Sequence, residues 1–555
     1  MVQFFIKYKI PLQYSSIYLL AVAALFLRME KPYFVLGKYL WAEDGMVFAA
    51  QAQKVGWAAL FTPHAGYLNT FQRIIAFIAN LFDVRLLPAF YILGWLLSWF
   101  LMVHCLYRAT QILKIGYGFT LLALAVVLFQ PSNGEIHFHL VNSQWTFAVC
   151  LCLAIAVDFS VVNANKIPRN ILLGLFGLTG PFIAILSPVL VARLLLLKDW
   201  QENKSSYLTL FTALIVMVLC IAFGGRLLGT KRVFDFAPWI DGFFSLAMPG
   251  IHTTYKLLFG VALVFLLCFF KTDNRTDWHR ISLLLSCAFL CVVATSAIFS
   301  AGAWSSYLSS MAPTGGRYTW VPWSILLFLI IFLVSKQRTT LFFVIPLLAC
   351  LTLSGFRVFH LENIDFHFNS FVNFAHYISE VQIPINPRFS FSMVLPRAWQ
   401  NAAKKTTPIT INREETRFVG LESSDYDQFR LLNDDPQIFI AQPIDCGDNS
   451  ANTSDIAVEI KMSRSIAGPM QLFWSDAAGK DSMWRIYPEG KVNAQFAFPY
   501  KGGLLNLRFH PANAKKAQIW AVWDTTGHAR FGPDNVKDQQ ISIVWPIKIW
   551  CLPSN

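Results

Sequence analysis

Apolar runs of about span length recur along the first two thirds of this chain, and they constrain its fold more than any other feature. About 20 consecutive apolar residues reach across the hydrocarbon core of a bilayer. Only 14% of the 555 residues are charged, against about 25% in soluble proteins. We therefore expect a polytopic α-helical membrane protein. The candidate spans lie at about 14–29, 87–107, 115–131, 143–162, 205–223, 253–270, 280–300, 319–335 and 340–356.

The apolar stretch 170–198 differs from the other runs because it is long for one span and is broken by Gly180-Pro181. Proline interrupts helical hydrogen bonding, so we read this stretch as two short helices that meet at Thr179–Pro181. With the other runs it gives about eleven transmembrane helices. A single span here would reverse the orientation of everything that follows it.

Basic residues set the expected orientation. Lys7 and Lys9 precede the first span, and the loops that would share their side are basic or mixed in charge, as the positive-inside rule requires. The first run lacks a small-residue cleavage site, so we expect an anchor with a cytoplasmic N-terminus. This distribution accounts for the net charge of +13 without a nucleic-acid partner. The external loops then lie near 30–86, 132–142, 178–182, 224–252 and 301–318.

The composition of the sequence changes at about residue 390. From there on, short segments of alternating polar and apolar residues, typical of strands, are separated by turn residues. They predict an all-β sandwich over 391–555, after a transmembrane domain over 1–390. Of the ten cysteines, only Cys446 and Cys551 lie in this polar part, and an extracytoplasmic domain allows a disulfide between them. The expected strands include 456–462, 470–475, 482–488, 494–500, 504–511 and 517–524.

Two adjacent acids, Glu43 and Asp44, follow the first span in the sequence WAEDG. Between apolar residues such a pair is costly unless it meets water, a cation or a substrate. Asp44 is suited to start a helix through Met46–Gly56, because its carboxylate would lie near the positive end of that helix.

A second amphipathic pattern follows the break at 63–66 in the same external loop. Asn69 and Arg73 lie four residues apart and share the polar face of this expected helix. The alternative for the whole loop is an interfacial hairpin whose polar face meets water. The residues of the apolar face are Phe71, Ile74, Ile75, Ile78, Leu81 and Phe82.

The next external loop gathers polar side chains between two spans. Glu135, His137 and His139 alternate, so an extended segment would place all three on one side. Two histidines and one acid lack a clear fourth ligand, so we predict no metal site and favour a wall that hydrogen-bonds hydroxyl groups, with Asn142. The alternative is a loop with interfacial histidines at the lipid boundary.

Cations mark two later external loops. Arg226 and Arg232 suit a lipid-borne phosphate, or they belong to an ordinary solvated loop. Arg317 stands at the mouth of a span after two glycines, where it either meets a ligand or snorkels to the interface. The segment IPINPRFSFSMVL (383–395) is a stiff connection that either lines the site or only links the two domains.

These groups suit one reaction. A carboxylate can take a proton from an attacking hydroxyl, and guanidinium groups can stabilise a departing lipid phosphate. The expected chemistry is sugar transfer from a polyprenyl-phosphate carrier outside the cytoplasm. One carboxylate base implies a single displacement with inversion, since a retaining route needs a second carboxylate close by.

On these residues the chain resembles the GT-C class of integral-membrane glycosyltransferases, and more narrowly bacterial transferases of surface-polysaccharide or protein glycosylation. The resemblance implies an enzyme of the bacterial inner membrane with a lipid-phosphate-linked donor, a glycan or protein acceptor and an extracytoplasmic C-terminal domain. Some members of the class need a divalent metal, and the sequence leaves the cofactor open. The resemblance lies in WAEDG (41–45), GYLNTFQR (66–73), NGEIHFHLVNSQW (133–145), GLTGPFIAILSP (177–188), GGRY (315–318) and PINP (384–387).

The resemblance also assigns roles. It implies that Asp44, or else Glu43, is catalytic, because the class carries an acid in its first external loop. The sandwich resembles an accessory carbohydrate-binding-type module. The expected substrate- and lipid-phosphate-binding residues are Arg73, Arg317, Glu135, His137, Asn142, Tyr67, Arg226 and Arg232.

Two other classes of function remain open. A transporter or flippase of a lipid-linked sugar would explain the broken hairpin at residue 180, although the sequence has no repeated halves. A membrane anchor that displays a sugar-binding sandwich would leave the polar loops at 40–73 and 130–145 without a role.

Overall fold

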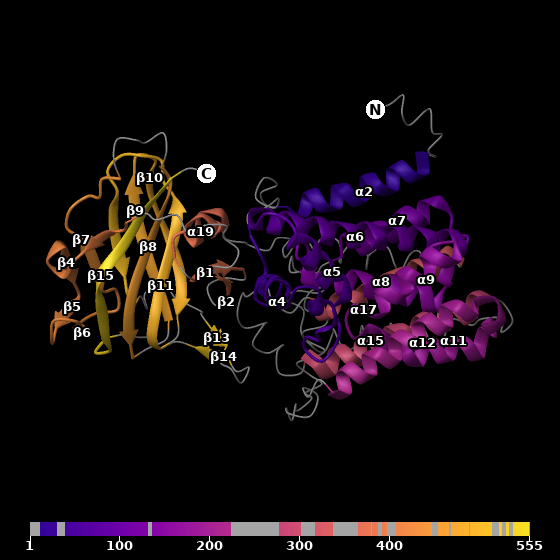
Figure 1. Cartoon of the computed structure of the whole chain (residues 1–555). Coiled ribbons are helices and arrows are strands. Elements are labelled where there is room, and N and C mark those ends of the chain that lie inside the picture. Colours follow the sequence, from indigo (N-terminus) through magenta and orange to yellow (C-terminus); the bar gives the residue numbers. More distant parts are fainter. Residues whose placement is uncertain are drawn as a thin grey trace, which may run out of the picture. The chain divides into compact units, whose positions relative to one another are not determined.

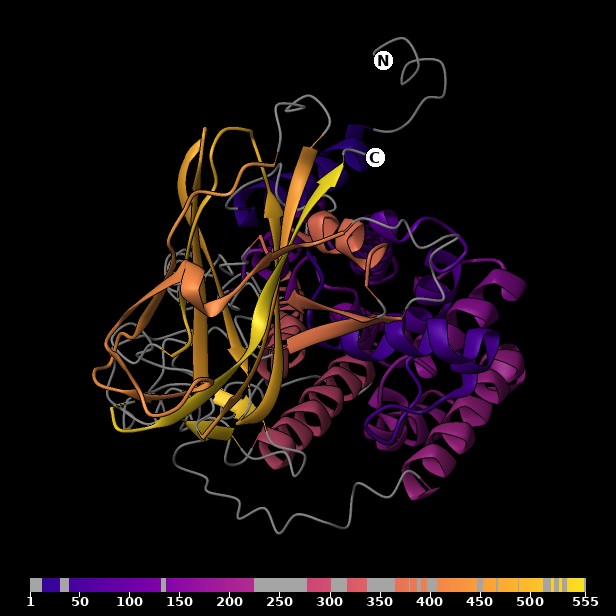
Figure 2. The same cartoon turned by 60° about the vertical axis from the view of Figure 1, so that its left-hand side comes forward.

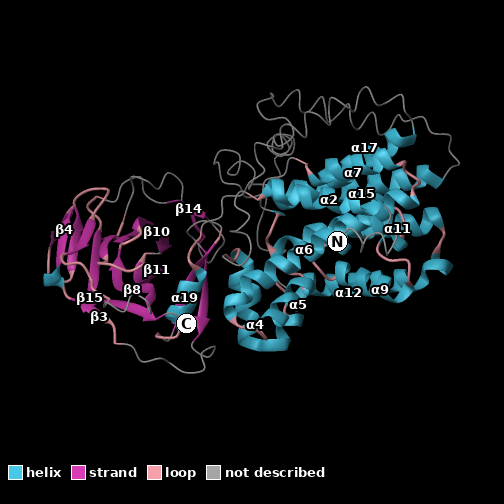
Figure 3. Ribbon diagram, turned by 90° about the horizontal axis from the view of Figure 1, so that it is seen from above, coloured by secondary structure: helices cyan, strands magenta, loops and turns pink. Residues whose placement is uncertain are grey.

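The computed structural model forms two compact units, which are described separately here (Figure 3). The helical unit comprises Met1–Val35, Val55–Leu81 and Phe90–Glu362, and the sandwich unit comprises Leu36–Lys54, Phe82–Ala89 and Asn363–Asn555. The predicted division into domains 1–390 and 391–555 stays a prediction. The structure describes residues 12–29, 39–130, 136–223, 277–300, 317–336, 365–378, 380–386, 391–396, 407–446, 453–465, 468–487, 489–512, 521–523, 529–531 and 537–553.

Helices make up the described part of the helical unit (Figure 1). Four are long and apolar enough to cross a membrane: Val84–Ile112, Trp200–Phe223, Trp278–Thr295 and Arg317–Lys336. The described residues thus support a helical membrane part, and about eleven spans are not shown. The predicted spans 253–270 and 340–356 lie outside the described residues. The helices are α2 (Leu12–Arg28), η2 (Gly56–Phe61), α5 (Thr70–Ala79), α6 (Leu87–Ile112), α7 (Tyr117–Leu128), η5 (Leu140–Asn142), α8 (Ser143–Ala156), η6 (Phe159–Val161), α9 (Lys166–Gly177), α10 (Phe182–Ile185), α11 (Ser187–Leu197), α12 (Trp200–Phe223), α15 (Asp277–Ser300) and α17 (Arg317–Lys336).

Short helices stand beside long ones in this unit. Helices α7 and α9 have 12 residues each, which is roughly 18 Å at 1.5 Å per residue. The 26 residues of α6 reach roughly 39 Å. The short helices therefore end beside the middle of the long ones. Gln130, after α7, donates to the Ser324 hydroxyl within α17 at 2.7 Å, and Gly177, at the end of α9, packs on Ala213 within α12.

Buried arginines bind the carbonyl groups at the ends of short helices that have no hydrogen bond within the helix. Arg28, at the end of α2, donates to Leu128 O at 3.2 Å and to Gln130 O at 2.9 Å at the end of α7. The last carbonyls of a helix lack intrahelical donors and attract cations. Arg28 therefore caps α7 in a place where water cannot.

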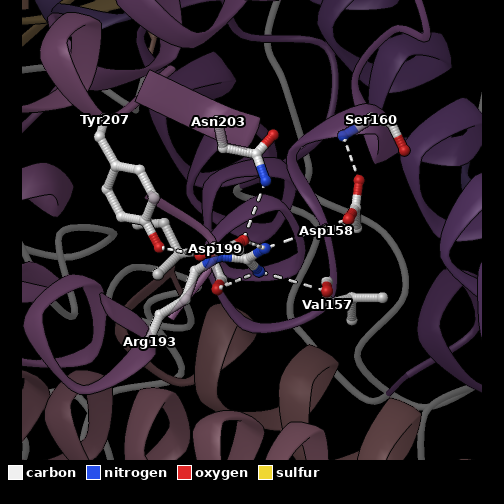
Figure 4. Close-up of polar contacts among 8 residues, drawn as sticks. Val157, Asp158, Ser160, Arg193, Asp199, Asn203 and Tyr207 are labelled. Atoms are coloured by element: carbon white, nitrogen blue, oxygen red, sulfur yellow. Dashed lines mark hydrogen bonds and ion pairs between the residues drawn. The ribbon is translucent and has the colours of Figure 1, made fainter. Parts of the chain in front are cut away.

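A second capping arginine joins α8, α11 and α12 at the other end of the unit (Figure 4). Arg193 donates to Ile155 O at 3.0 Å and Val157 O at 3.2 Å, and it pairs with Asp199 at 2.5 Å. Asp199 also accepts hydrogen bonds from Tyr207 and Asn203, at 2.6 and 2.9 Å. Burial by itself raises the pKa of Asp199, but these hydrogen bonds and the charge of Arg193 hold that pKa below its usual range. These contacts give the cluster a structural role, although the buried Nε of Arg193 has no hydrogen-bond partner among the described residues.

Two antiparallel sheets form the core of the sandwich unit, and their two layers separate in the view of Figure 2. The five-stranded sheet has the order β10-β9-β12-β7-β4, and the six-stranded sheet has the order β11-β8-β15-β6-β5 with β3 paired to β15. The strands are β3 (Ile409–Ile411), β4 (Thr416–Val419), β5 (Leu421–Ser423), β6 (Gln428–Leu431), β7 (Gln437–Ile440), β8 (Thr453–Arg464), β9 (Gly468–Asp476), β10 (Gly479–Tyr487), β11 (Gly490–Pro499), β12 (Asn506–His510) and β15 (Gln540–Pro553), with a separate pair β13 (Ala521–Trp523) and β14 (Ala529–Phe531).

Aromatic side chains pack between the two sheets, because alternate residues of each strand face inward. The rings of Trp474 on β9 and Phe498 on β11 stack at 4.0 Å, and Phe496 and Phe509 lie 6.1 Å apart. The expected Cys446–Cys551 disulfide is present, with a Cα–Cα distance of 5.7 Å. It closes a loop that includes most strands of the sandwich.

A helix and a hairpin dock on the six-stranded sheet. In helix α19 (Phe368–Ala375), Ser370 and Asn373 each donate to the buried carboxylate of Asp455 on β8, both at 2.6 Å. Gln495 on β11 accepts from the backbone of Gln382 at 2.9 Å. These bonds hold the hairpin β1 (Glu380–Ile385) and β2 (Phe391–Pro396) to the sandwich.

We expect Arg193→Met to destabilise the helical unit by about 3–5 kcal/mol, because removing the guanidinium leaves the Asp199 carboxylate without its cation and the carbonyl groups of Ile155 and Val157 without this donor. Thermal unfolding of the purified protein in detergent measures the change. Arg85→Met is the matched control, since Arg85 also pairs with an aspartate at 2.5 Å but is 45% exposed. It should cost less than about 1 kcal/mol. Equal effects of the two changes would show that burial of the Arg193 pair does not matter.

Candidate functional site

Three segments that are far apart in the sequence meet at one end of the helical unit. Gly180 donates its backbone N–H to Leu68 O at 2.9 Å, and the Thr70 hydroxyl donates to Leu178 O at 3.0 Å. Gly180 has a positive φ of 89° and lies against Gln144, whose Oε1 would be 2.9 Å from an added Cβ. The sequence motifs 66–73, 133–145 and 177–188 therefore come together here.

The fourth motif of the helical unit joins them through aromatic rings. Trp145, in the first turn of α8, lies 5.5 Å from Tyr318 in α17 and 5.2 Å from Phe182. Arg317 begins α17, and its guanidinium lies 5.3 Å from the Tyr318 ring. This contact brings Arg317 to the same end of the unit as the broken hairpin.

Helix α5 has its polar face turned inward. Gln72 and Arg73 are at most 1% exposed, as is Asn69 just before the helix, whereas Ile78 is 38% exposed; the apolar Phe71, at 4%, is buried with them. The Gln72 amide donates to Val141 O at 3.1 Å, beside the buried Asn142. Water would favour the opposite orientation, so this inversion is the pattern of a helix with lipid outside and a polar interior.

The inner stripe of α6 continues the polar interior. Tyr91 lies close enough to Arg73 to interact with it electrostatically. One and two turns further along α6, Trp95 and Trp99 enclose the ring of His137, at 5.7 and 5.2 Å between ring centres. His137 is 1% exposed, and neither of its ring nitrogens has a hydrogen-bond partner among the described residues.

We call this group the polar cluster. It lies beside the first half of the long helix α6, and polar groups at the depth of a membrane interior are costly unless they bind one another or a ligand. Non-helical backbone is tolerated at that depth only where protein buries it or where it lines a water-filled space. The polar cluster consists of Asn69, Gln72, Arg73, Gln130, His137 and Asn142.

Several predicted site residues lie elsewhere or are not described. Tyr67 closes a tight turn in which its backbone exchanges two hydrogen bonds with that of His64, at 2.9 and 3.1 Å. Tyr67 therefore stands at the edge of the docked segment. The predicted residues Glu135, Arg226 and Arg232 lie outside the described residues.

The acid pair belongs to the sandwich unit. Ala42 donates to Asn386 O at 2.6 Å and Asn386 donates to Leu40 O at 2.9 Å, so the motifs 41–45 and 384–387 bind each other directly. Asp44 begins η1 (Asp44–Ala49), a π-helical segment continued by α4 (Ala50–Val55), and is 2% exposed. The expected helix over 46–56 is thus largely present.

Close packing holds this acidic helix. A Cβ on Gly45 would come within 2.8 Å of Ile385 Cδ1 and 3.3 Å of Met393 Cβ in the hairpin. Glu43 is half-buried, and its Oε2 has no hydrogen-bond partner among the described residues. π-Helical turns are rare and occur often at functional sites. The hairpin therefore fixes the position of both acids.

Sequence reasoning missed Arg28 and Gln72. Arg28 lies at the end of the first predicted span, on the side opposite Lys7 and Lys9. The positive-inside rule does not expect a cation on that side, and this exception to the rule was the signal in the sequence. Gln72 carried no signal beyond its neighbour Arg73. Among the described residues, no group of three or more His, Cys, Asp or Glu side chains is placed to hold a metal ion.

No protein-family model, no curated protein and no solved structure matches this chain.

We expect Gly180→Ala to destabilise the junction of the three segments by about 1–3 kcal/mol, because φ is positive there and Gln144 blocks the added methyl group. Thermal unfolding in detergent measures the loss. Gly118→Ala is the matched control: it lies in α7 with no atom within 4 Å of an added Cβ, so it should be neutral or slightly stabilising. A Gly180→Ala protein as stable as the control would contradict the packing described.

Proposed function

We propose that this protein is a membrane glycosyltransferase of the GT-C type that moves a sugar from a polyprenyl-phosphate-linked donor to a glycan or protein acceptor. The observation that carries the proposal is the buried polar cluster beside apolar helices that expose large hydrophobic side chains. A donor with a lipid tail and a charged phosphate needs both environments at one place. Soluble nucleotide-sugar enzymes do not need such an inverted helix.

Arg73 and Arg317 are the proposed phosphate-binding residues. Guanidinium groups bind phosphate oxygens in a bidentate manner and keep their charge in apolar surroundings. Arg73 is buried on the inner face of α5, and Arg317 begins a helix at the same end of the unit. Asn142 and His137 are proposed to bind hydroxyl groups of the sugar.

Asp44 is the proposed base, with Glu43 as the alternative. A buried carboxylate can accept the proton of the attacking acceptor hydroxyl as the new glycosidic bond forms and the lipid phosphate leaves. A single displacement of this kind inverts the anomeric configuration. The tight packing of Gly45 on the hairpin supports a fixed position for this carboxylate.

The proposed location is the bacterial inner membrane, with the N-terminus in the cytoplasm and the sandwich unit outside. Two features support it. The Cys446–Cys551 disulfide suits an oxidising compartment. Lys336 donates to Leu113 O at 2.9 Å, so the basic segments after α6 and α17 lie together, as residues on one cytoplasmic side should.

A flippase for a lipid-linked sugar is the second candidate, and the hairpin of α9 and α11 favours it. These helices have only 12 and 11 residues, and the chain between Gly177 and Ser187 is interrupted except for the four-residue helix α10. Transporters use such broken helices at their substrate sites. Movement of a labelled lipid-linked sugar across a vesicle membrane without transfer would favour this candidate.

We expect Asp44→Asn to lower sugar transfer by roughly 100-fold or more while the protein stays folded, because general acid–base catalysis contributes about that much. Incorporation of radiolabelled sugar from lipid-linked donors into acceptors, in membranes that contain the protein, measures the rate. Asp83→Asn is the control, because Asp83 is an exposed acid of the same unit. A normal rate for Asp44→Asn would exclude Asp44 as the base. Loss of transfer in Glu43→Gln alone would move that role to Glu43.

Topology is tested through the disulfide. In Cys551→Ser, we expect the freed and half-buried Cys446 thiol to react in intact cells, after the outer membrane is made permeable, with a maleimide that cannot cross the inner membrane. The double variant Cys446→Ser/Cys551→Ser gives the background from the remaining cysteines. Labelling that appears only after the inner membrane is broken would place the sandwich unit in the cytoplasm.

A further inference from the structure

The outer face of the five-stranded sheet carries side chains that packing does not explain. Along β9, Met470, Leu472 and Trp474 are buried against the other sheet, so Gln471 and Phe473 point to the opposite face. Phe473 is half-buried, whereas Gln471 is only 2% exposed and is therefore covered. The partly exposed ring of Phe473 calls for an explanation.

Cations and aromatic rings alternate across this face. The strand registers place Phe473 beside Arg508, Arg508 beside Phe439, and Phe439 beside Arg417 on the edge strand β4. Ser482 on β10 completes the row next to Phe473. Facing side chains on neighbouring strands lie about 4.5–5.5 Å apart at Cβ, so the row is continuous.

Arg508 is held between two rings. Its guanidinium carbon lies 4.1 Å from the centre of Phe473 and 5.7 Å from that of Phe439. Among the described residues it makes no ion pair, and its buried Nε has no hydrogen-bond partner. Stacking orients a guanidinium while leaving its N–H edge available for an acidic group.

The two neighbouring rows extend the face. In one, Trp484 lies beside Gln471, and Gln471 beside His510. The Gln471 amide donates to Ser482 at 3.1 Å, and its buried oxygen has no partner among the described residues. In the other row, Lys480 lies beside Ser475. Gln471 and His510 are each 2% exposed, so the face offers ring surfaces and hydroxyl groups within a few strands.

The charge of this face is positive. Arg508, Arg417 and Lys480 all point outward. The acid described beside them, Asp435, contacts His510 at 2.7 Å. A ligand that complements this face must therefore carry negative charge as well as hydroxyl groups and apolar ring faces.

We propose that the outer face of the five-stranded sheet binds an acidic saccharide, with Arg508 and Arg417 on its carboxylate or phosphate groups. Sugar rings stack on aromatic side chains through their C–H faces, and sugar hydroxyl groups can bind the hydroxyl groups of Ser475 and Ser482, which are half-buried. A lipid surface fits less well, because the rings of this face are half-buried and fixed in rows rather than projecting. The proposal concerns binding alone and does not rest on the proposed transfer reaction.

The test is binding of oligogalacturonic acid to the full-length protein in detergent, measured by calorimetry against a neutral maltooligosaccharide of equal length. We expect the acidic oligosaccharide to bind and the neutral one to bind at least about tenfold more weakly, which is about 1.4 kcal/mol. Arg508→Gln should weaken acidic binding by about tenfold or more, and added salt should weaken it further. Arg508→Lys should bind the acidic oligosaccharide almost as weakly as Arg508→Gln, because lysine lacks the planar guanidinium that stacks on the two rings.

Arg430→Gln is the matched control, since Arg430 lies on β6 of the other sheet and pairs with Asp538. It should leave binding unchanged. Failure of oligogalacturonate to bind at millimolar concentration would overturn the proposal, as would equal binding by wild type and Arg508→Gln. Binding to vesicles with anionic lipids that Arg508→Gln abolishes, without saccharide binding, would assign the face to a membrane instead.

Discussion

Backbone groups that leave a helix inside a bilayer must find hydrogen-bond partners within the protein, and the helical unit depends on how they do so. Helix α7 ends well short of the length of a span, and Arg28 binds its last carbonyl groups. Arg193 does the same for α8 at the other end of the unit. These two buried cations allow short helices to stand among long ones. Non-helical segments that carry polar side chains occupy the space beside the long helices beyond the ends of the short ones.

The same constraint explains why α5 is turned inside out. Its segment must bond to the break after α9 through Thr70 and Leu178, and this docking fixes which face looks inward. Arg73 and Gln72 then lie inside together with Phe71, while Ile78 is exposed. In a soluble protein the polar face of such an amphipathic helix would be exposed to water. In a membrane protein, where lipid surrounds the helices, the polar face is expected to be buried instead.

The architecture followed from the sequence more readily than the site. The break at Gly180-Pro181, the strands of the sandwich and the disulfide were all predicted, since proline, alternation and cysteine spacing are local signals. The pairing of Trp41 with Asn386 was not, because 345 residues separate them and no local pattern encodes that contact. The length of α7 was also overestimated, since the expected span 115–131 is a helix over Tyr117–Leu128, and hydropathy does not reveal a helix that ends early beside a capping arginine.

The bridge between Trp41 and Asn386 has a consequence for biosynthesis. The acidic helix is translated before the hairpin that receives it, and that hairpin rests on strands translated later still. Strand β15, which carries Cys551, follows the other described strands in the sequence and occupies the middle of its sheet. Glu43 and Asp44 therefore acquire their final surroundings only after the strands of the sandwich unit have been translated. A nascent or prematurely terminated chain would be inserted yet lack its assembled acid pair.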